Sequence, residues 1–367
     1  MSSQTAPEHP APSAMGGLQR AMLRLPIRQI FLVVLAILLA VGLFLGIRSN
    51  LQAGVLSGAD YRSFVVDGIA RGALYAVIAV GYTLVYGILF LINFAHGEVF
   101  MAGAFTSFFV ARTLSQIGFL NDHPFISIVI LLLVSMAVST ITAILLERIA
   151  YRRLRGAPRL IPLITAIGAS LFLQNTFRAL YGANTRGYPV PESMQGRMDI
   201  FGIPVLRTQT LVIVGAALLM IGLYFFIERT KTGRSMRAVG EDREIASLMG
   251  INVDRVIVQT FAIGGMLAGA AGVLWAMVFG QVDFFMGFFP GIKAFTAAVL
   301  GGIGNIVGAG LGGLLLGVLE SLAPYLFISP SVPSPNQLTD AIAFTILVLI
   351  LIFRPGGILG SSDEEKA

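Results

Sequence analysis

Residues 125–147 read FISIVILLLVSMAVSTITAILLE, and this stretch decides the class of the protein. No charged side chain interrupts it before Glu147, and Arg148 follows at once. A helix needs about 20 apolar residues to cross the hydrocarbon core of a bilayer. Backbone amides cannot stay unpaired there, so such a run must be helical or shielded by neighbours. The stretch therefore predicts a membrane-spanning helix.

The rest of the chain repeats this pattern. Comparable apolar runs lie at 30–47, 64–92, 94–113, 160–180, 210–227, 256–281, 287–302, 304–323 and 338–353. We therefore predict an all-α fold, a polytopic transmembrane helical bundle of about nine or ten spans. The glycine-rich region 300–312 is a candidate for a broken or re-entrant helix.

The composition supports a surface that is covered by lipid. Of 367 residues, 56% are hydrophobic and 12% are charged, whereas a soluble domain carries about 25% charged residues. The net charge of +6 comes from basic residues between the apolar runs, which is typical of membrane topology rather than of a nucleic-acid groove. The chain has no cysteine and three scattered histidines. Disulfides and thiolate sites are therefore excluded, and no metal site is predicted.

The basic connections predict the orientation of the bundle. Arginines crowd the connection 148–159 and, with one lysine, the connection 229–255. Two apolar runs separate these connections, so both lie on one side of the membrane. The positive-inside rule makes that side cytoplasmic. With the predicted spans, both chain termini are cytoplasmic.

The chain divides into four predicted segments. Residues 1–28 are rich in Pro, Ser and Ala and are predicted to form a disordered cytoplasmic tail. Residues 29–62 are predicted to form an N-terminal anchor helix and an outer loop; a signal peptide is the alternative, although the apolar run is long for one. Residues 63–355 form the predicted transmembrane domain, which includes the cytoplasmic connection 228–255. Residues 356–367 form a second cytoplasmic tail.

Charged residues within the predicted spans need partners. Asp67 and Arg71 lie four residues apart, which favours an ion pair on one helix face. Lys293 has a candidate partner in Glu320 of the next run. Glycines four residues apart, which let helices approach closely, occur at Gly265–Gly269, Gly308–Gly312 and Gly313–Gly317.

Two breaks between the apolar runs offer candidates for a substrate pathway. Polar groups at such breaks are costly, and they mark either a pathway or a structural network. The candidate pathway residues are Asn93, His96, Glu98, Gly301, Gly302, Gly304 and Asn305. Two structural alternatives stay open, namely a network of hydrogen bonds at the first break and a tight turn at the second.

The connection 228–255, ERTKTGRSMRAVGEDREIASLMGINVDR, is patterned like a short helix. Glu241 and Asp242 suit a helix N-terminus, where acidic groups oppose the helix dipole. Gly250 is the predicted C-cap and Asn252 caps the next helix, which gives a helix of about 10 residues. Positions i, i+3 and i+4 carry the apolar residues Ile245, Leu248 and Met249. This face either packs on its own bundle, lies in the lipid interface or docks into a groove on a partner.

Four blocks of sequence carry a resemblance to a known family. In the connection, the family pattern is matched by Gly233, Arg234, Arg237, Ala238, Asp242, Ala246, Gly250, Ile251 and Asn252. The other blocks are GYTLVYGILFLINFAHGEVFMAGAF at 81–105, RLIPLITAIGASLFLQN at 159–175 and GIKAFTAAVLGGIGNIVGAGLGG at 291–313. The chain thus resembles the permease subunits of ABC importers of the branched-chain amino acid family. The resemblance covers roughly residues 60–360.

The resemblance implies a complex in the bacterial inner membrane. Its expected members are this chain, a homologous second permease subunit, two cytoplasmic ATPase subunits and a periplasmic substrate-binding protein, with membrane lipid around them. The chain lacks the Gly-x-x-x-x-Gly-Lys-[Ser/Thr] pattern that cradles nucleotide phosphates. We therefore expect a transport subunit that is not an enzyme and has no cofactor of its own, with ATP and Mg on the partner ATPases. The residues expected to contact the ATPase are Arg234, Arg237, Glu241, Asp242, Ile245, Leu248, Met249 and Gly250.

The implied function is inward passage of branched-chain or related hydrophobic amino acids. Urea, short amides or another small solute are the nearest alternative substrates. An ion-coupled secondary transporter is a further alternative, although it predicts coupling carboxylates or histidines within the spans, and few are found. An intramembrane enzyme would need a convergent catalytic set, which the scattered histidines do not provide.

Overall fold

The computed structural model describes residues 57–158, 160–200 and 202–326, with scattered positions within 41–52 and 339–359. The predicted tail 1–28 lies outside the described residues. So do most of the predicted anchor, of the run 338–353 and of the C-terminal tail. All statements below concern the described part of the chain.

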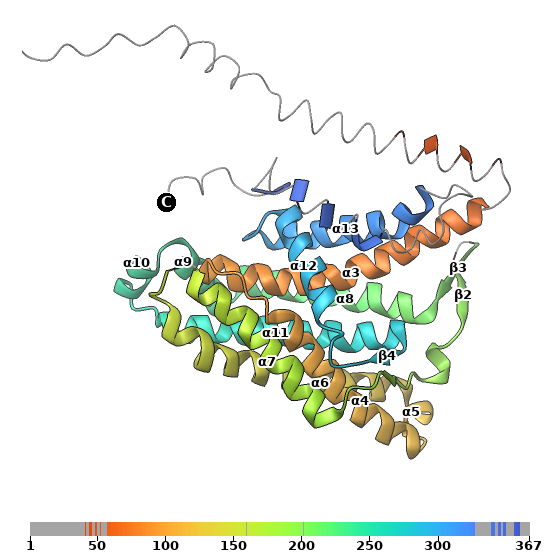
Figure 1. The fold of residues 1–367 in the computed structure, drawn as a ribbon, viewed down its shortest axis with the longest axis horizontal. Coiled ribbons are helices and arrows are strands. Elements are labelled where there is room, and N and C mark those ends of the chain that lie inside the picture. The colour runs from red at the N-terminus through yellow and green to blue at the C-terminus, as the bar shows by residue number, and fades with distance from the viewer. Residues whose placement is uncertain are drawn as a thin grey trace, which may run out of the picture.

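This part of the chain is a bundle of helices (Figure 1). Its main helices are α3 (Gly58–Leu89), α4 (His96–Gln116), α6 (Pro124–Leu146), α7 (Leu160–Tyr181), α8 (Arg207–Arg229), α11 (Val253–Phe279), α12 (Phe288–Gly301) and α13 (Ile306–Leu326). Each predicted run between 64 and 323 contains one of these helices, which confirms the all-α polytopic bundle. By length and composition, α3, α6, α7, α8 and α11 can each cross a membrane, whereas α12 is shorter.

Short elements lie at the two ends of the bundle (Figure 1). One end carries α9 (Lys231–Glu241) and α10 (Arg243–Leu248), and α6 continues there as a π-helical turn, η1 (Glu147–Tyr151), and a 3₁₀ turn, η2 (Arg152–Leu154). The other end carries α5 (Phe119–Asp122), η3 (Glu192–Met194), β1 (Arg186–Gly187), β2 (Arg197–Ile200), β3 (Ile203–Leu206) and β4 (Gln281–Val282). Both strand pairs are antiparallel, β1 with β4 and β2 with β3, and Arg186 lies opposite Val282. We call these the α10 end and the β2–β3 end.

The core of the bundle is formed around α3 and α11. In their most apolar windows, 89% of α3 and 72% of α11 are buried, against 28% of α6, 33% of α7 and 22% of α8. The exposed residues of these three helices include apolar side chains such as Phe125, Phe172 and Leu218. Lipid is the solvent that suits such surfaces. The chain is therefore a multi-pass membrane protein.

Small residues bring the helix backbones into contact. A Cβ atom added at Gly313 or Gly317 of α13 would collide with the backbone of α3 at Ala76 or Gly72. Gly269 of α11 lies equally close to Ser135 of α6, whose hydroxyl donates to the Gly269 carbonyl at 2.7 Å. The predicted role of the glycine repeats is thus confirmed. Apolar packing gives membrane helices no hydrophobic driving force, so close van der Waals contact has to hold them together.

The two predicted breaks are real but differ in form. After Leu89 the chain turns back into the bundle as the non-helical segment 90–95, and α4 begins at His96, whose ring lies beside Gly81 of α3 and Gly264 of α11. The second break is a tight turn between α12 and α13, with positive φ at Gly302 (106°) and Gly304 (97°). The structure therefore supports the tight-turn interpretation of the second break.

The predicted pair of Asp67 and Arg71 is wrong. Arg71 instead points to Glu320 of α13, with 3.9 Å between nitrogen and oxygen, and Asp67 accepts a hydrogen bond from Gln209 of α8. The close packing of α3 against α13 offers Arg71 a carboxylate that sequence spacing could not reveal. The predicted pair of Lys293 and Glu320 is confirmed, with Lys293 Nζ 2.8 Å from Glu320 Oε1.

Candidate functional site

Helices α9 and α10 form an elbow whose corner is fixed by a capping residue. Asp242 has an extended backbone between the two helices, and its Oδ1 accepts hydrogen bonds from the amides of Glu244 (2.8 Å) and Ile245 (2.9 Å). Such an N-cap satisfies amides that have no partner within the helix. Asp242 thus begins α10, as predicted.

The far end of α10 is capped as the sequence indicates. Gly250 has a φ of +83°, a conformation that glycine adopts without strain. Asn252 Oδ1 then accepts from the amide of Arg255 at 2.9 Å and starts α11. The predicted length of the helix is wrong, because α10 spans only Arg243–Leu248, and α9 continues through Gly240 to Glu241. Glu241 therefore ends α9 and does not begin α10.

Three apolar side chains, two on α10 and one at its C-cap, face away from the bundle. Ile245 is 59% exposed, Leu248 82% and Met249 78%, whereas Ala246 between them is buried. We call Ile245, Leu248 and Met249 the α10 stripe. This result rules out the alternative in which the stripe packs on the described part of its own bundle. The remaining alternatives are lipid and a partner protein.

Helix α9 presents basic side chains beside the stripe. Met236 and Val239 are buried against the bundle, while Arg234 and Arg237 are exposed on the other side of α9. Arg237 forms an ion pair with Glu228 at the end of α8. The predicted ATPase-contact residues therefore lie together at the α10 end, although Arg237 is already partly neutralised.

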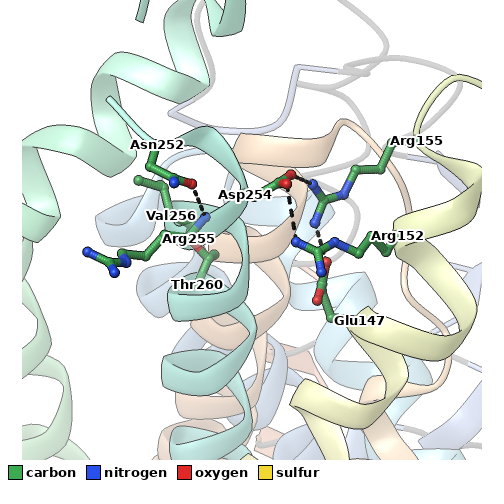
Figure 2. A network of polar contacts seen from close by, with 8 residues as sticks. All are labelled: Glu147, Arg152, Arg155, Asn252, Asp254, Arg255, Val256 and Thr260. Atoms are coloured by element: carbon green, nitrogen blue, oxygen red, sulfur yellow. Dashed lines mark hydrogen bonds and ion pairs between the residues drawn. The ribbon is translucent and has the colours of Figure 1, made fainter. Parts of the chain in front are cut away.

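An ion cluster joins the two basic connections (Figure 2). Arg155 contacts both Glu147 of η1, which is fully buried, and Asp254 at the start of α11. Arg152 also reaches Asp254, at 3.1 Å. The guanidinium of Arg255 points away from this cluster (Figure 2). Both basic connections thus lie at one end of the bundle, as predicted.

Sequence reasoning overlooked Arg243, the first residue of α10. Its Nε and Nη2 atoms lie 3.2 and 2.5 Å from the carbonyl oxygen of Ile88, near the C-terminus of α3. Partial burial, and secondarily the positive charge of Arg155, lower the pKa of the Arg243 guanidinium. An arginine nevertheless stays charged near neutral pH. The partner of Arg243 is a backbone carbonyl, which leaves no signal in the sequence. The one available clue was a basic residue within an acidic stretch.

The candidate pathway residues of the first break are buried in separate environments. Asn93 Oδ1 accepts from the Tyr151 hydroxyl (2.6 Å) and from the Ala95 amide (3.1 Å). Glu98 Oε1 accepts from Ser170 (3.1 Å) and Gln174 (2.7 Å) of α7. These contacts are the hydrogen-bond network that the sequence left as an alternative. His96 points elsewhere, toward Gly81 and Gly264, so the three do not converge on one ligand.

A cavity of about 10 Å³ lies where segment 90–95 meets α3 and α12. Its walls are Tyr82, Thr83, Tyr86, Leu91, Ile92, Asn93, Phe295, Ala298 and Ile303. The volume is that of about one water molecule. Asn93 and the 302–305 turn, through Ile303, are thus brought together. Gly301, Gly302, Gly304 and Asn305 do not line it, and Asn305 caps α13 by accepting from the Gly308 amide at 2.9 Å.

We predict that Asp242→Ala loosens α10 without unfolding the bundle. Loss of an N-cap costs about 1 kcal/mol, which corresponds to roughly fivefold faster amide exchange in α10, because RT ln 5 is about 1 kcal/mol. Hydrogen exchange of residues 244–249 measures the effect, and the amides of 260–275 in α11 are the internal control. Unchanged exchange in α10 would contradict the capping role.

Comparison with known proteins identifies the family of the chain. The family model described as "Branched-chain amino acid transport system / permease component" matches residues 64–351. The high-affinity branched-chain amino acid transport system permease protein BraD of Pseudomonas aeruginosa is 44% identical over 309 residues, which are 83% of this chain and 98% of the relative. Its counterpart LivH of Escherichia coli K12 is 40% identical over 303 residues, 82% of this chain and 96% of the relative.

A more distant relative comes from an archaeon. The probable branched-chain amino acid transport permease protein LivH of Methanocaldococcus jannaschii is 29% identical over 308 residues, 81% of this chain and 92% of the relative. No solved structure is a match to the chain. The family model spans nearly the whole described bundle, from α3 to α13. The chain therefore belongs to the family of permease components of branched-chain amino acid transport systems.

Proposed function

We propose that this chain is the permease subunit of an ATP-driven ABC importer that passes branched-chain or related hydrophobic amino acids inward. The α10 stripe is the observation that carries the proposal, because three apolar side chains are held in the open by a well-capped helix. An apolar helix face of this kind suits a groove on a partner protein. Family membership supports the choice of transport and of substrate class.

The proposal places the α10 end in the cytoplasm of a bacterium whose inner membrane holds the bundle. Two copies of a cytoplasmic ATPase would hold ATP and Mg and contact the α10 stripe together with Arg234, Arg237, Glu241, Asp242 and Gly250. A homologous second permease subunit would complete the pore, and a periplasmic binding protein would deliver the substrate at the β2–β3 end. In this arrangement both termini are cytoplasmic, in accordance with the basic residues at the α10 end.

Transport would follow from a change in the relative stability of two states. An ATPase pair that closes on ATP binds one orientation of the two elbows better than the other, and this difference in affinity shifts the permease between inward- and outward-facing forms. The cavity beside segment 90–95 is too small for an amino acid. It therefore corresponds to a closed pathway in this proposal, and the shift would have to widen it.

Reconstitution tests the proposal directly. The complete set of subunits in liposomes, with ATP and Mg trapped inside and the binding protein added outside, should accumulate labelled leucine only when all three are supplied. Labelled urea in parallel vesicles tests the alternative substrate class. Leucine uptake that needs no ATPase subunits and follows an ion gradient would contradict the proposal.

We predict that Leu248→Asp abolishes recovery of the ATPase with the permease. The substitution puts a charge into a stripe that docking would bury, and a central contact of an interface contributes about 2 kcal/mol or more. ATPase co-purified per permease should therefore fall at least tenfold, since about 1.4 kcal/mol corresponds to tenfold. Leu248→Met, which keeps the side chain apolar, is the matched control. The bundle should melt as in the wild type, because Leu248 is 82% exposed, and undiminished recovery would refute the docking role.

A further inference from the structure

Arg243 joins the elbow to the end of α3. Its fork of donors meets the Ile88 carbonyl at 3.2 and 2.5 Å. The last carbonyls of a helix have no partner within the helix, and a cation is favourable there. The backbones also come close, because a Cβ atom at Gly240 of α9 would lie 2.9 Å from the Gly87 carbonyl oxygen. The elbow is therefore attached to α3 by a charged hydrogen bond and by a direct backbone approach.

The chain is strained directly after this attachment. Phe90 has a φ of +53° and, among the described residues, is the one non-glycine residue with positive φ. Its amide donates to the Tyr86 carbonyl at 2.7 Å. A bulky residue keeps this conformation only where its surroundings enforce it, and such strain gathers at switch regions. Phe90 is the point at which the chain reverses into the bundle.

The segment that follows Phe90 forms a wall of the cavity. Leu91, Ile92 and Asn93 line it, opposite Phe295 and Ala298 of α12. The Tyr151 hydroxyl donates to Asn93 at 2.6 Å and fixes the inner part of segment 90–95. The outer end of the segment, at Phe90, is connected directly to the C-terminus of α3. A shift of the α3 terminus therefore changes the shape of segment 90–95 rather than moving it as a whole.

We propose that Arg243 is the positioning residue that transmits movement of the α10 stripe to segment 90–95. The inference rests on the proposed function, since it names the route by which the ATPase would act on the pathway. Arg243 lies on the bundle side of α10 and the α10 stripe on the opposite side. Arg243 therefore attaches α10 to α3, while the three stripe residues contact the proposed ATPase. Removing the guanidinium leaves the stripe intact and cuts the charged link to α3.

The test compares transport with ATP hydrolysis in the reconstituted complex. Arg243→Gln keeps a polar side chain but loses the positive charge and the paired N–H donors of the guanidinium group. We expect it to recover the ATPase subunits at the wild-type level and to hydrolyse ATP, while leucine uptake per ATP hydrolysed falls at least tenfold. Arg243→Lys keeps the charge and should restore part of this ratio. Arg255→Gln, the same change on a side chain that points away from the ion cluster (Figure 2), is the matched control and should leave the ratio unchanged.

A second readout follows the segment itself. The chain has no cysteine, so Leu91→Cys introduces a single thiol into the cavity wall. Its rate of reaction with a water-soluble maleimide should change at least threefold when a non-hydrolysable ATP analogue binds the complex. Adding Arg243→Lys to the Leu91→Cys chain should reduce this change in rate. The Arg243→Lys variant keeps the test available even if Arg243→Gln fails to assemble with the ATPase. A full response in the arginine variants would overturn the proposal.

The outcomes separate this inference from the proposed function. Wild-type leucine uptake per ATP in Arg243→Gln contradicts the role of Arg243 and leaves the importer proposal standing. Loss of ATPase recovery in both Arg243→Gln and Arg243→Lys also contradicts it, because Arg243 would then be part of the docking surface. If the wild-type chain binds no ATPase and takes up no leucine with ATP, the importer proposal fails and this inference fails with it.

Discussion

Replacing Gly317 by alanine is expected to destabilise the bundle by about 3 kcal/mol, the upper part of the usual range for overpacking. The added Cβ would collide with the backbone of Gly72 and approach the Gly68 carbonyl. Backbone atoms cannot rotate away as side chains do, so α13 and α3 would have to separate. Helices in lipid depend on close van der Waals contact, and these two form the most extensive helix pair in the described bundle.

The measurement is equilibrium unfolding in mixed micelles, followed by the fluorescence of Trp275. This residue is the chain's one tryptophan, and it packs on Phe279 with ring centres 4.1 Å apart. Gly222→Ala in α8 is the matched control, because its added Cβ meets no atom within 4 Å. There the change should stabilise by up to about 1 kcal/mol, the helix propensity of alanine over glycine. Equal effects at both positions would show that backbone contact does not hold α3 to α13.

Lys293→Met is expected to cost about 3–5 kcal/mol, the usual loss when one partner of a buried ion pair is removed. Glu320 is 3% exposed, and Lys293 Nζ lies 2.8 Å from its Oε1 and 2.6 Å from Asp340 Oδ1. Without the ammonium group, the described cation left near Glu320 is the more distant Arg71, at 3.9 Å. The unfolding transition should therefore move to much milder conditions.

A second substitution identifies the origin of this loss. Lys293→Met combined with Glu320→Met replaces the pair by apolar groups, and such replacements are frequently neutral or stabilising. We expect the double variant to regain most of the free energy of unfolding. Lys231→Met, at an exposed position of α9, should change it by less than about 0.5 kcal/mol. If the double variant is as unstable as Lys293→Met alone, the cost lies in packing and not in the unpaired carboxylate.

The helices and their caps could be predicted from sequence because both depend on local chemistry. An apolar run of about 20 residues has no stable alternative to a helix in lipid. Asp242, Gly250 and Asn252 act on atoms within three or four residues, so their spacing contained the answer. The length of α10 was harder to predict, since Glu241 and Asp242 both suit a helix N-terminus, whereas in the structure Glu241 is the last residue of α9.

The partners of charged groups depend on how distant helices pack, and this is where sequence reasoning failed. Arg71 meets Glu320 rather than Asp67 because α13 approaches α3 through its glycines. Arg243 was overlooked because its partner is a carbonyl 155 residues away. Asn93 and the 302–305 turn meet at one cavity, while His96 and Glu98 face other helices. The spacing of these residues in the sequence does not show which of them line the cavity and which face other helices.

The exposed apolar side chains of the α10 stripe also bear on how much of this chain a cell can accumulate. A copy inserted without the proposed partner subunits would keep an apolar patch exposed to water. Such patches promote aggregation and degradation. Stoichiometric synthesis of the whole assembly is the simplest way to avoid such waste. In the proposed importer, surplus copies of the permease would therefore be degraded, and the supply of the ATPase would limit how much permease accumulates.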